Sequence, residues 1–190
     1  MNYIDILKFS PDELKDLTIS TFAIALIFAW NGRGFPHIDS WFILYFMIIL
    51  FTVGSGFVLH ELAHRTVARH FGALSEFKAW YEGLAIALVL KIVVGFTFIA
   101  PGAVYIYKDY LTKRENGLIS LAGPLTNVAL ALIFYMIHIP LISDIGYYVN
   151  MFLAAFNMIP IPPLDGSKVL SWNPIIYVIV AVPLFFAVFL

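Results

Sequence analysis

The octapeptide FVLHELAH, residues 57–64, places three ionisable side chains in an otherwise hydrophobic run. His60, Glu61 and His64 match the pattern H-E-x-x-H. Residues four apart lie on the same face of a helix, so both imidazoles can bind one metal ion. Glu61 is turned by about 100° around the helix and can reach a water molecule beside the metal without being a ligand. We therefore predict a metal-dependent hydrolytic site with Glu61 as general base.

The expected metal is zinc, with one Zn²⁺ ion per chain. The chain has no cysteine, so the ligands must be histidine, aspartate or glutamate. Catalytic zinc takes three protein ligands and keeps one position open, which His60 and His64 only partly satisfy. The alternative is that the three polar residues simply mark a helix end at the lipid headgroups.

Asp165 is the best candidate for the third ligand. It follows Pro160, Pro162 and Pro163, which cannot sustain a helix, so the preceding helix should unwind there. Unwound backbone at membrane depth is tolerated where it lines a cavity, and Gly166 allows a tight turn behind the carboxylate. The other acids considered lie in loops or at helix ends: Glu82, Asp109, Glu115 and Asp144. An ordinary loop aspartate is the alternative for Asp165.

The composition indicates that these residues lie in an integral membrane protein. Of the 190 residues, 62% are hydrophobic and 12% are charged, whereas a soluble domain is about half apolar and a quarter charged. The mean hydropathy is +0.91. The net charge of −1 gives no electrostatic case for binding nucleic acid. The N-terminus carries Asp5 and no cleavage motif, so we expect the first span to be retained.

The elements that position the site are predicted to be about five transmembrane helices in an all-α, multi-pass fold. Ser10, Pro11 and Glu13 form a helix-start pattern with a capping box. The expected helices are Pro11 to about Trp30, Ser40 to His70, Asn116 to Ile137, Ile145 to Pro160, and Asn173 to Leu190. We expect a single domain of residues 1–190 with a catalytic core of residues 41–168.

The segment Gly83 to Tyr107 fits two structures equally well by composition. Two β-prone runs flank Pro101-Gly102, which favours a re-entrant hairpin over residues 96–107. The alternative is one transmembrane helix that carries Lys91. If the segment does not cross and the N-terminus is cytoplasmic, only Arg33 among the basic residues of the other segments lies outside. We therefore expect a re-entrant, β-hairpin-like element at about residues 83–107, between the second and third helices.

The depth of the site follows from the length of the second helix. From Trp41 to His60 there are 19 steps, or about 28 Å at 1.5 Å per residue. This length nearly equals the ~30 Å hydrocarbon thickness. The metal is therefore expected near the cytoplasmic side of the membrane, which we take to be a prokaryotic cell membrane.

Three motifs together resemble the site-2 protease family of intramembrane zinc metalloproteases. They are HELAH at residues 60–64, LAGPLTN at residues 121–127, and Asn157 followed by Pro160 and PLDG at residues 163–166. The resemblance covers Trp41 to Lys168. It implies that His60, His64 and Asp165 bind zinc and that Glu61 is the catalytic carboxylate. It also implies a three-span core and a partly β re-entrant element. The chain departs from the family at Ser167, where many members have a second glycine.

Two asparagines could support the chemistry. Asn157 is expected to donate its amide N–H to the scissile carbonyl or its oxyanion, and the alternative is a helix–helix hydrogen bond. Asn127 has the same two interpretations, of which packing or support of a ligand is favoured. The remaining histidines, His37, His70 and His138, are interfacial and are not expected to be ligands.

Together with this resemblance, these residues predict an endopeptidase that hydrolyses peptide bonds in the transmembrane segment of a membrane protein substrate, as in regulated intramembrane proteolysis. The re-entrant hairpin would hold the unwound substrate as an added strand, so proline at Thr97 or Val104 should impair cleavage. The alternatives are a non-hydrolytic metal-binding membrane protein, such as a transporter or sensor, and an inactive family member. The transporter alternative leaves Glu61 unexplained and requires a polar path across the membrane, for which residues are scarce.

Overall fold

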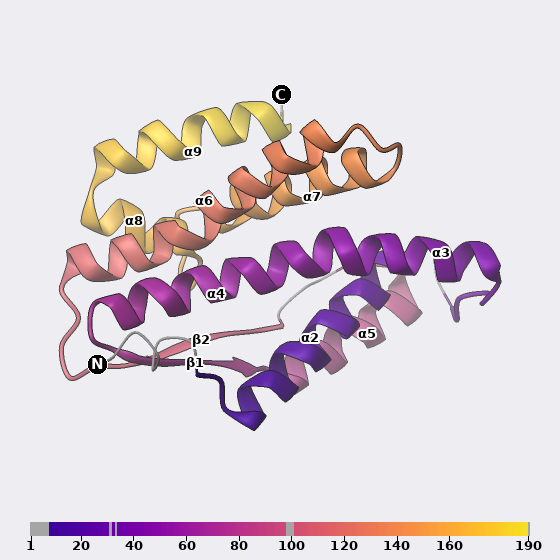
Figure 1. The fold of residues 1–190 in the computed structure, drawn as a ribbon, viewed down its shortest axis with the longest axis horizontal. Helices are drawn as coiled ribbons and strands as arrows, with labels where there is room; N and C mark the ends of the chain where they lie inside the picture. Colours follow the sequence, from indigo (N-terminus) through magenta and orange to yellow (C-terminus); the bar gives the residue numbers. More distant parts are fainter. Residues whose placement is uncertain (1–7, 31, 33, 98–100, 190) are drawn as a thin grey trace.

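The computed structural model describes residues 8–30, 32, 34–97 and 101–189. It confirms a predominantly helical chain, with one two-stranded sheet (Figure 1). In chain order the elements are α2 (Pro11–Ala29), α3 (Ser40–Ile49), η1 (Leu50–Gly54), α4 (Ser55–His70), β1 (Leu74–Ala79), α5 (Tyr81–Val94), β2 (Gly102–Tyr107), α6 (Lys113–Ile137), α7 (Ile142–Asn157), α8 (Asp165–Trp172) and α9 (Pro174–Phe189).

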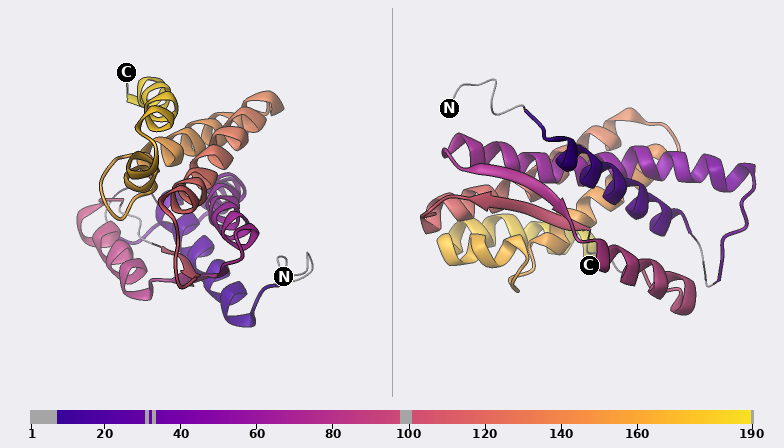
Figure 2. Two further views of the ribbon diagram at one scale, coloured as in Figure 1. Left: turned by 90° about the vertical axis from the view of Figure 1, so that its left-hand side faces the viewer. Right: turned by 90° about the horizontal axis from the view of Figure 1, so that it is seen from below.

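The helix that carries the H-E-x-x-H pattern is continuous from Ser40 to His70, as predicted. It consists of α3, η1 and α4, and the Asp39 side chain caps its start by accepting the N–H of Phe42 at 2.8 Å. The middle part, η1, is π-helical, which the sequence did not predict. Helix α4 lies between α6 and the sheet and contacts both of them (Figures 1 and 2).

Helix α6 is the centre of the helical part, since it packs against α4, α7 and α8. Thr112 and Glu115 form a capping box at its start. Pro124 lies inside this helix. A Cβ at Gly117 would lie 2.5 Å from the Cβ of Trp172, so glycine there allows α8 to approach α6 closely.

The expected hairpin over residues 96–107 is wrong in its pairing. Strand β2 exists, but its antiparallel partner is β1, with Leu74 opposite Tyr107 and Ala79 opposite Gly102. Phe96 and Thr97 lie outside any strand, and residues 98–100 lie outside the described residues. Helix α5 occupies most of the chain between β1 and β2. Its leucine- and alanine-rich sequence favours a helix more strongly than the following β-prone residues favour a strand. Gly95, with φ of 78°, ends this helix.

The predicted capping box at the start of α2 is half correct. Ser10 accepts the N–H of Glu13 at 3.0 Å, but the Glu13 carboxylate does not reach back to the cap. It accepts the Nε–H of Arg65 at 2.7 Å and the N–H of Phe77 at 3.1 Å. The N–H of Ala79, two residues further along β1, also points away from β2 and donates to the Asp16 carboxylate at 2.9 Å. Helix α2 therefore covers the outer edge of β1 with two carboxylates.

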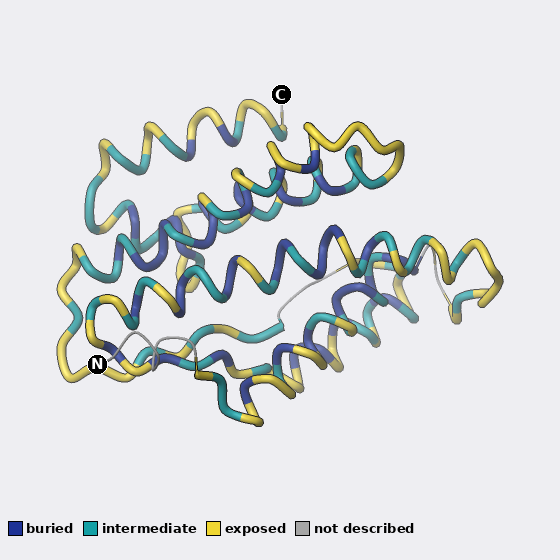
Figure 3. The backbone as a smooth tube through the Cα atoms, in the orientation of Figure 1, coloured by how far each residue is buried: buried dark blue, intermediate teal, exposed yellow. Residues whose placement is uncertain are grey.

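Two of the described helices are long and apolar enough to cross a membrane: Ser40–His70 and Lys113–Ile137. Helix α9 is apolar but shorter. Exposed positions recur along α9 and at the turn between α6 and α7 (Figure 3). Arg33 and the first seven residues, which entered the charge and signal-peptide arguments, lie outside the described residues.

Candidate metal centre

The side chains of His60, His64 and Asp165 converge on one point. Their ligand atoms lie within 4.8 Å of one another, and all three residues are buried. The Oδ2 atom of Asp165 is 3.1 Å from Nε2 of His64 and 3.4 Å from Nε2 of His60. The two Nε2 atoms are 2.9 Å apart. The structure thus brings the three predicted ligands together from two helices that are about a hundred residues apart in sequence.

Asp165 reaches the histidines because α7 ends early and α8 begins at Asp165 itself. Helix α7 stops at Asn157, and residues 158–164 form turns, which confirms that the proline-rich segment is not helical. Gly166 was expected to allow a tight turn, but it lies inside α8, where a glycine is needed for a different reason. A Cβ there would lie 2.2 Å from the carbonyl oxygen of Met158. Glycine therefore allows the start of α8 to press against the end of α7.

Helix α6 determines the tautomer of both histidines. Nδ1 of His64 is 2.7 Å from the carbonyl oxygen of Ile119, which can only accept, so Nδ1 carries the proton. Nδ1 of His60 is 2.6 Å from Oδ1 of Asn127. The Nδ2 of Asn127 donates to the carbonyl of Gly56 at 3.1 Å, which leaves Oδ1 as the acceptor from His60. Both Nε2 atoms therefore present lone pairs to Asp165.

This arrangement fits a zinc ion. Two imidazole lone pairs and a carboxylate oxygen face one another at close range, and a cation relieves their repulsion. Two nitrogens and one oxygen are also a donor set that catalytic zinc takes. Glycine at position 123 leaves space for an ion, since a Cβ there would lie 2.5 Å from Nε2 of His64 and 2.6 Å from Nε2 of His60. Nζ of Lys168 lies 3.5 Å from Oδ1 of Asp165, whereas Oδ2 is the oxygen near the two histidines.

Glu61 lies beside these ligands at a hollow of about 190 Å³. The hollow is lined by residues of α4, β2, α6 and the α7–α8 region, among them His60, Glu61, His64, Gly102, Val104, Ile106, Ser120, Asn157, Asp165 and Lys168. Asn157 also donates an amide N–H to the carbonyl of its own helix residue Leu153 at 2.9 Å. All five predicted site residues therefore border one space.

The sequence analysis missed two contributors to this site and gave a third the wrong partner. The third is β2, which forms one wall of the hollow and pairs with β1. Ile119 acts through its backbone carbonyl, for which a sequence holds no signal. Asn150 is buried on α7 and bonds to Asn127 at 2.9 Å. It could have been found in the same way as Asn157, as an isolated amide in an apolar helix.

Comparison with known proteins decides the family. The chain is 57% identical, over 189 residues and 95% of each chain, to a Methanocaldococcus jannaschii protein named “Putative zinc metalloprotease MJ0611”. This chain belongs to the zinc metalloprotease family. It is also 30% identical over 134 residues to Rip2 of Mycolicibacterium smegmatis, covering 52% of that protein, and 28% identical over 149 residues to YwhC of Bacillus subtilis, covering 67%. Both have the same description.

Neither a protein-family model nor a solved structure matches this zinc metalloprotease. The expected zinc cofactor is confirmed by the description of the relatives together with the group formed by His60, His64 and Asp165. The assignment of individual roles to the site residues stays a prediction.

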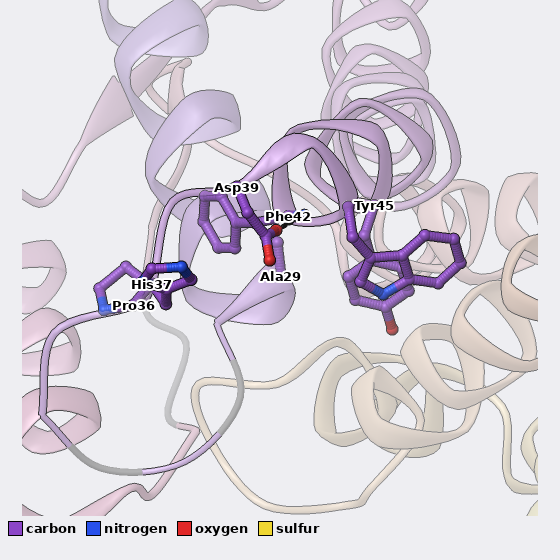
Figure 4. Close-up of a pocket in the computed structure, with 7 residues that line it drawn as sticks. Ala29, Pro36, His37, Asp39, Phe42 and Tyr45 are labelled. Atoms are coloured by element: carbon purple, nitrogen blue, oxygen red, sulfur yellow. Dashed lines mark hydrogen bonds between the residues drawn. The ribbon is translucent and has the colours of Figure 1, made fainter.

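A second hollow of about 180 Å³ lies between the end of α2 and the start of α3 (Figure 4). His37 and Asp39 line it, but Asp39 is engaged as the cap of α3. Within the described part of the chain, neither residue belongs to a group of potential metal ligands. This hollow therefore adds no second candidate centre.

Proposed function

We propose that this protein is an intramembrane endopeptidase of the site-2 protease kind, which cleaves the transmembrane segment of a membrane protein substrate. The observation that supports this most directly is the placement of Glu61 and three metal ligands at one hollow beside a sheet edge. The whole chain would form one domain, with its core at residues 41–168. The site would lie toward the cytoplasmic side of a prokaryotic cell membrane.

The distribution of apolar and polar side chains supports a membrane location. Large apolar residues on the outside are frequent: Met136 on α6 is 73% exposed and Ile175 on α9 is 71% exposed. Polar residues such as Asn127 and Asn150 are completely buried. An apolar exterior around a polar interior is favourable in lipid and costly in water. We infer five spans, formed by α2, the helix Ser40–His70, α6, α7 and α9.

Different residues of the site would bind the metal, transfer the proton and stabilise the reacting carbonyl. Zinc, when bound, acts as a Lewis acid that polarises a carbonyl and lowers the pKa of water. His60, His64 and Asp165 would hold the ion. Glu61 would take the proton from the attacking water and deliver it to the leaving amine. Asn157, at the rim of the hollow, would donate its remaining amide N–H to the carbonyl that develops negative charge.

Strand β2 offers a backbone edge to an unwound substrate. The N–H of Phe77 donates to Glu13, away from β2, so the pair Phe77–Val104 is not hydrogen-bonded within the sheet. Val104, and by alternation Gly102 and Ile106, therefore direct their N–H and C=O groups to the other edge of β2. These three residues line the hollow at the metal ligands. A substrate strand paired with them would place its backbone beside Glu61.

Proline at position 104 should lower cleavage about three- to tenfold, the effect of losing one backbone hydrogen bond. Its ring removes the N–H that faces the hollow, which donates to the Glu61 carboxylate in this structure and which a substrate strand would have to take over, but none that pairs with β1. Val104→Ala retains this N–H and serves as the control. Cleavage of a transmembrane reporter and zinc content would be measured together, and equal cleavage by both variants would contradict the edge model. Proline at Thr97 is no longer a test, because Thr97 lies outside the strands and bonds to Lys91.

The proposed function is tested by comparing the wild type with Glu61→Gln. Purified protein should contain one zinc per chain in both. The variant should cleave a transmembrane reporter about 10²- to 10⁴-fold more slowly, since it lacks the general base. Equal cleavage by both proteins would refute the role of Glu61. Metal-dependent transport that persists in Glu61→Gln, with no cleavage by the wild type, would support a transporter instead.

A further inference from the structure

Three buried side chains connect the metal centre to helix α7. His60 on α4 donates to Asn127 on α6, and Asn127 donates to Oδ1 of Asn150 on α7 at 2.9 Å. Both asparagines are 0% exposed. Asn150 is thus two hydrogen bonds away from the metal ligand and touches no part of the hollow described above.

The surroundings of Asn150 fix the direction of this chain of bonds. Its Nδ2 is 2.8 Å from the carbonyl oxygen of Gly146 and 3.5 Å from that of Thr52, in the π-helical segment η1. Carbonyl oxygens accept only, so the NH₂ group of Asn150 must face them and its Oδ1 must face Asn127. Gly56 leaves the space for this orientation, since a Cβ there would lie 2.5 Å from Oδ1 of Asn150.

We propose that Asn150 is a positioning residue of the metal centre, which acts through Asn127 to keep the proton of His60 on Nδ1. By accepting from Nδ2 of Asn127, together with the carbonyl of Gly56, it holds the amide oxygen of Asn127 against His60. Nε2 of His60 is then unprotonated and available to zinc. The inference rests on the proposed function only through the role of His60 as a ligand.

An apolar residue at position 150 removes the acceptor for Nδ2 of Asn127. The amide of Asn127 is then held by one hydrogen bond instead of two, from Nδ2 to the carbonyl of Gly56 at 3.1 Å, so it can rotate more readily and present its NH₂ group to His60. In that arrangement Nδ1 of His60 becomes the acceptor and the proton moves to Nε2, where it competes with zinc. Loss of a partner that orients a metal ligand weakens metal binding about 10- to 100-fold.

The test measures zinc affinity by chelator competition on purified full-length protein in detergent. Asn150→Leu should bind zinc about 10- to 100-fold more weakly than the wild type. Asn150→Asp should bind within a few-fold of the wild type, since a carboxyl group kept neutral by burial accepts from Asn127 with one oxygen and donates its O–H to the carbonyl of Gly146 with the other. The matched control is Thr52→Val, which replaces a buried hydroxyl beside the network but retains the carbonyl that faces Asn150. Its affinity should equal that of the wild type.

A spectroscopic measurement separates positioning from packing. ¹⁵N spectra of histidine-labelled, metal-free protein should report a protonated Nδ1 of His60 in the wild type and a protonated Nε2 in Asn150→Leu. Unchanged affinity and tautomer in Asn150→Leu would overturn the proposal, and Asn150→Val takes its place if the leucine variant does not fold. Equal losses in the aspartate and leucine variants would also overturn it. Failure of the wild type to cleave a reporter would refute only the proposed function.

Discussion

Alanine at position 123 should lower zinc binding at least tenfold, and metal-dependent cleavage with it, without unfolding the protein. The added Cβ would lie 2.5 Å from Nε2 of His64 and 2.6 Å from Nε2 of His60. Both rings are held from behind by hydrogen bonds to Ile119 and Asn127, so they cannot retreat without breaking these bonds. The helix itself tolerates the change, because alanine has the higher helix propensity.

Zinc content after dialysis and thermal unfolding in detergent check this prediction. We expect less than a tenth of the wild-type zinc in Gly123→Ala, because removing the space for the ion costs at least as much as losing a partner of one ligand, about 10- to 100-fold. Thr126→Ser is the control, as it changes one methyl group on the same helix, where the hydroxyl bonds to the Ala122 carbonyl. Full zinc occupancy in Gly123→Ala would show that the ion does not lie beside α6.

Replacing Glu13 with leucine should destabilise the protein by about 3–5 kcal/mol, the cost of breaking a buried ion pair from one side. Glu13 and Arg65 are each 2% exposed. The substitution removes the carboxylate that accepts the Nε–H of Arg65 at 2.7 Å, whereas the contacts of Arg65 with the Lys8 carbonyl and with the ring of Phe9, 3.9 Å from its guanidinium carbon, can stay. It also leaves the N–H of Phe77 without its acceptor.

Unfolding by a denaturing detergent or by heat would measure the loss. Glu13→Gln should lie between the leucine variant and the wild type, since its amide oxygen still accepts from Arg65 or Phe77. Asp12→Leu is the matched control one residue earlier, at an exposed position, and should change stability by less than about 1 kcal/mol. A Glu13→Leu protein as stable as this control would mean that the ion pair is not a structural requirement.

The parts of the site that could be predicted from the sequence depend on residues that are close to one another along the chain. His60 and His64 lie four apart on one helix, and three prolines before Asp165 prevent a helix from continuing. Each signal lies within a few residues, so helical periodicity and proline stereochemistry were sufficient. The helix Ser40–His70 was predicted for the same reason, from a long apolar run with a polar end.

The parts that were missed depend on contacts between distant segments. Glu13 fits a capping box by its position, but the competing partner Arg65 is 52 residues away. The strand β2 was recognised, yet its partner β1 precedes an intervening helix, and strand pairing over such a distance leaves no local pattern. Gly166 was read as a turn residue, although its actual requirement is the nearby carbonyl of Met158. Tertiary contacts decided each of these cases.

The alternation of β2 sets a rule for where a substrate chain would be cut. Only every second residue of β2 presents its backbone groups to the hollow, so a paired chain can shift only in steps of two residues, about 6.8 Å. Glu13 bonds to Arg65, the residue after His64 on α4, and to Phe77 in the sheet, and so ties the sheet to the helix that carries both histidines. If a substrate is cut at more than one position, the products would therefore differ in length by even numbers of residues. Mass spectrometry of the fragments would reveal this pattern.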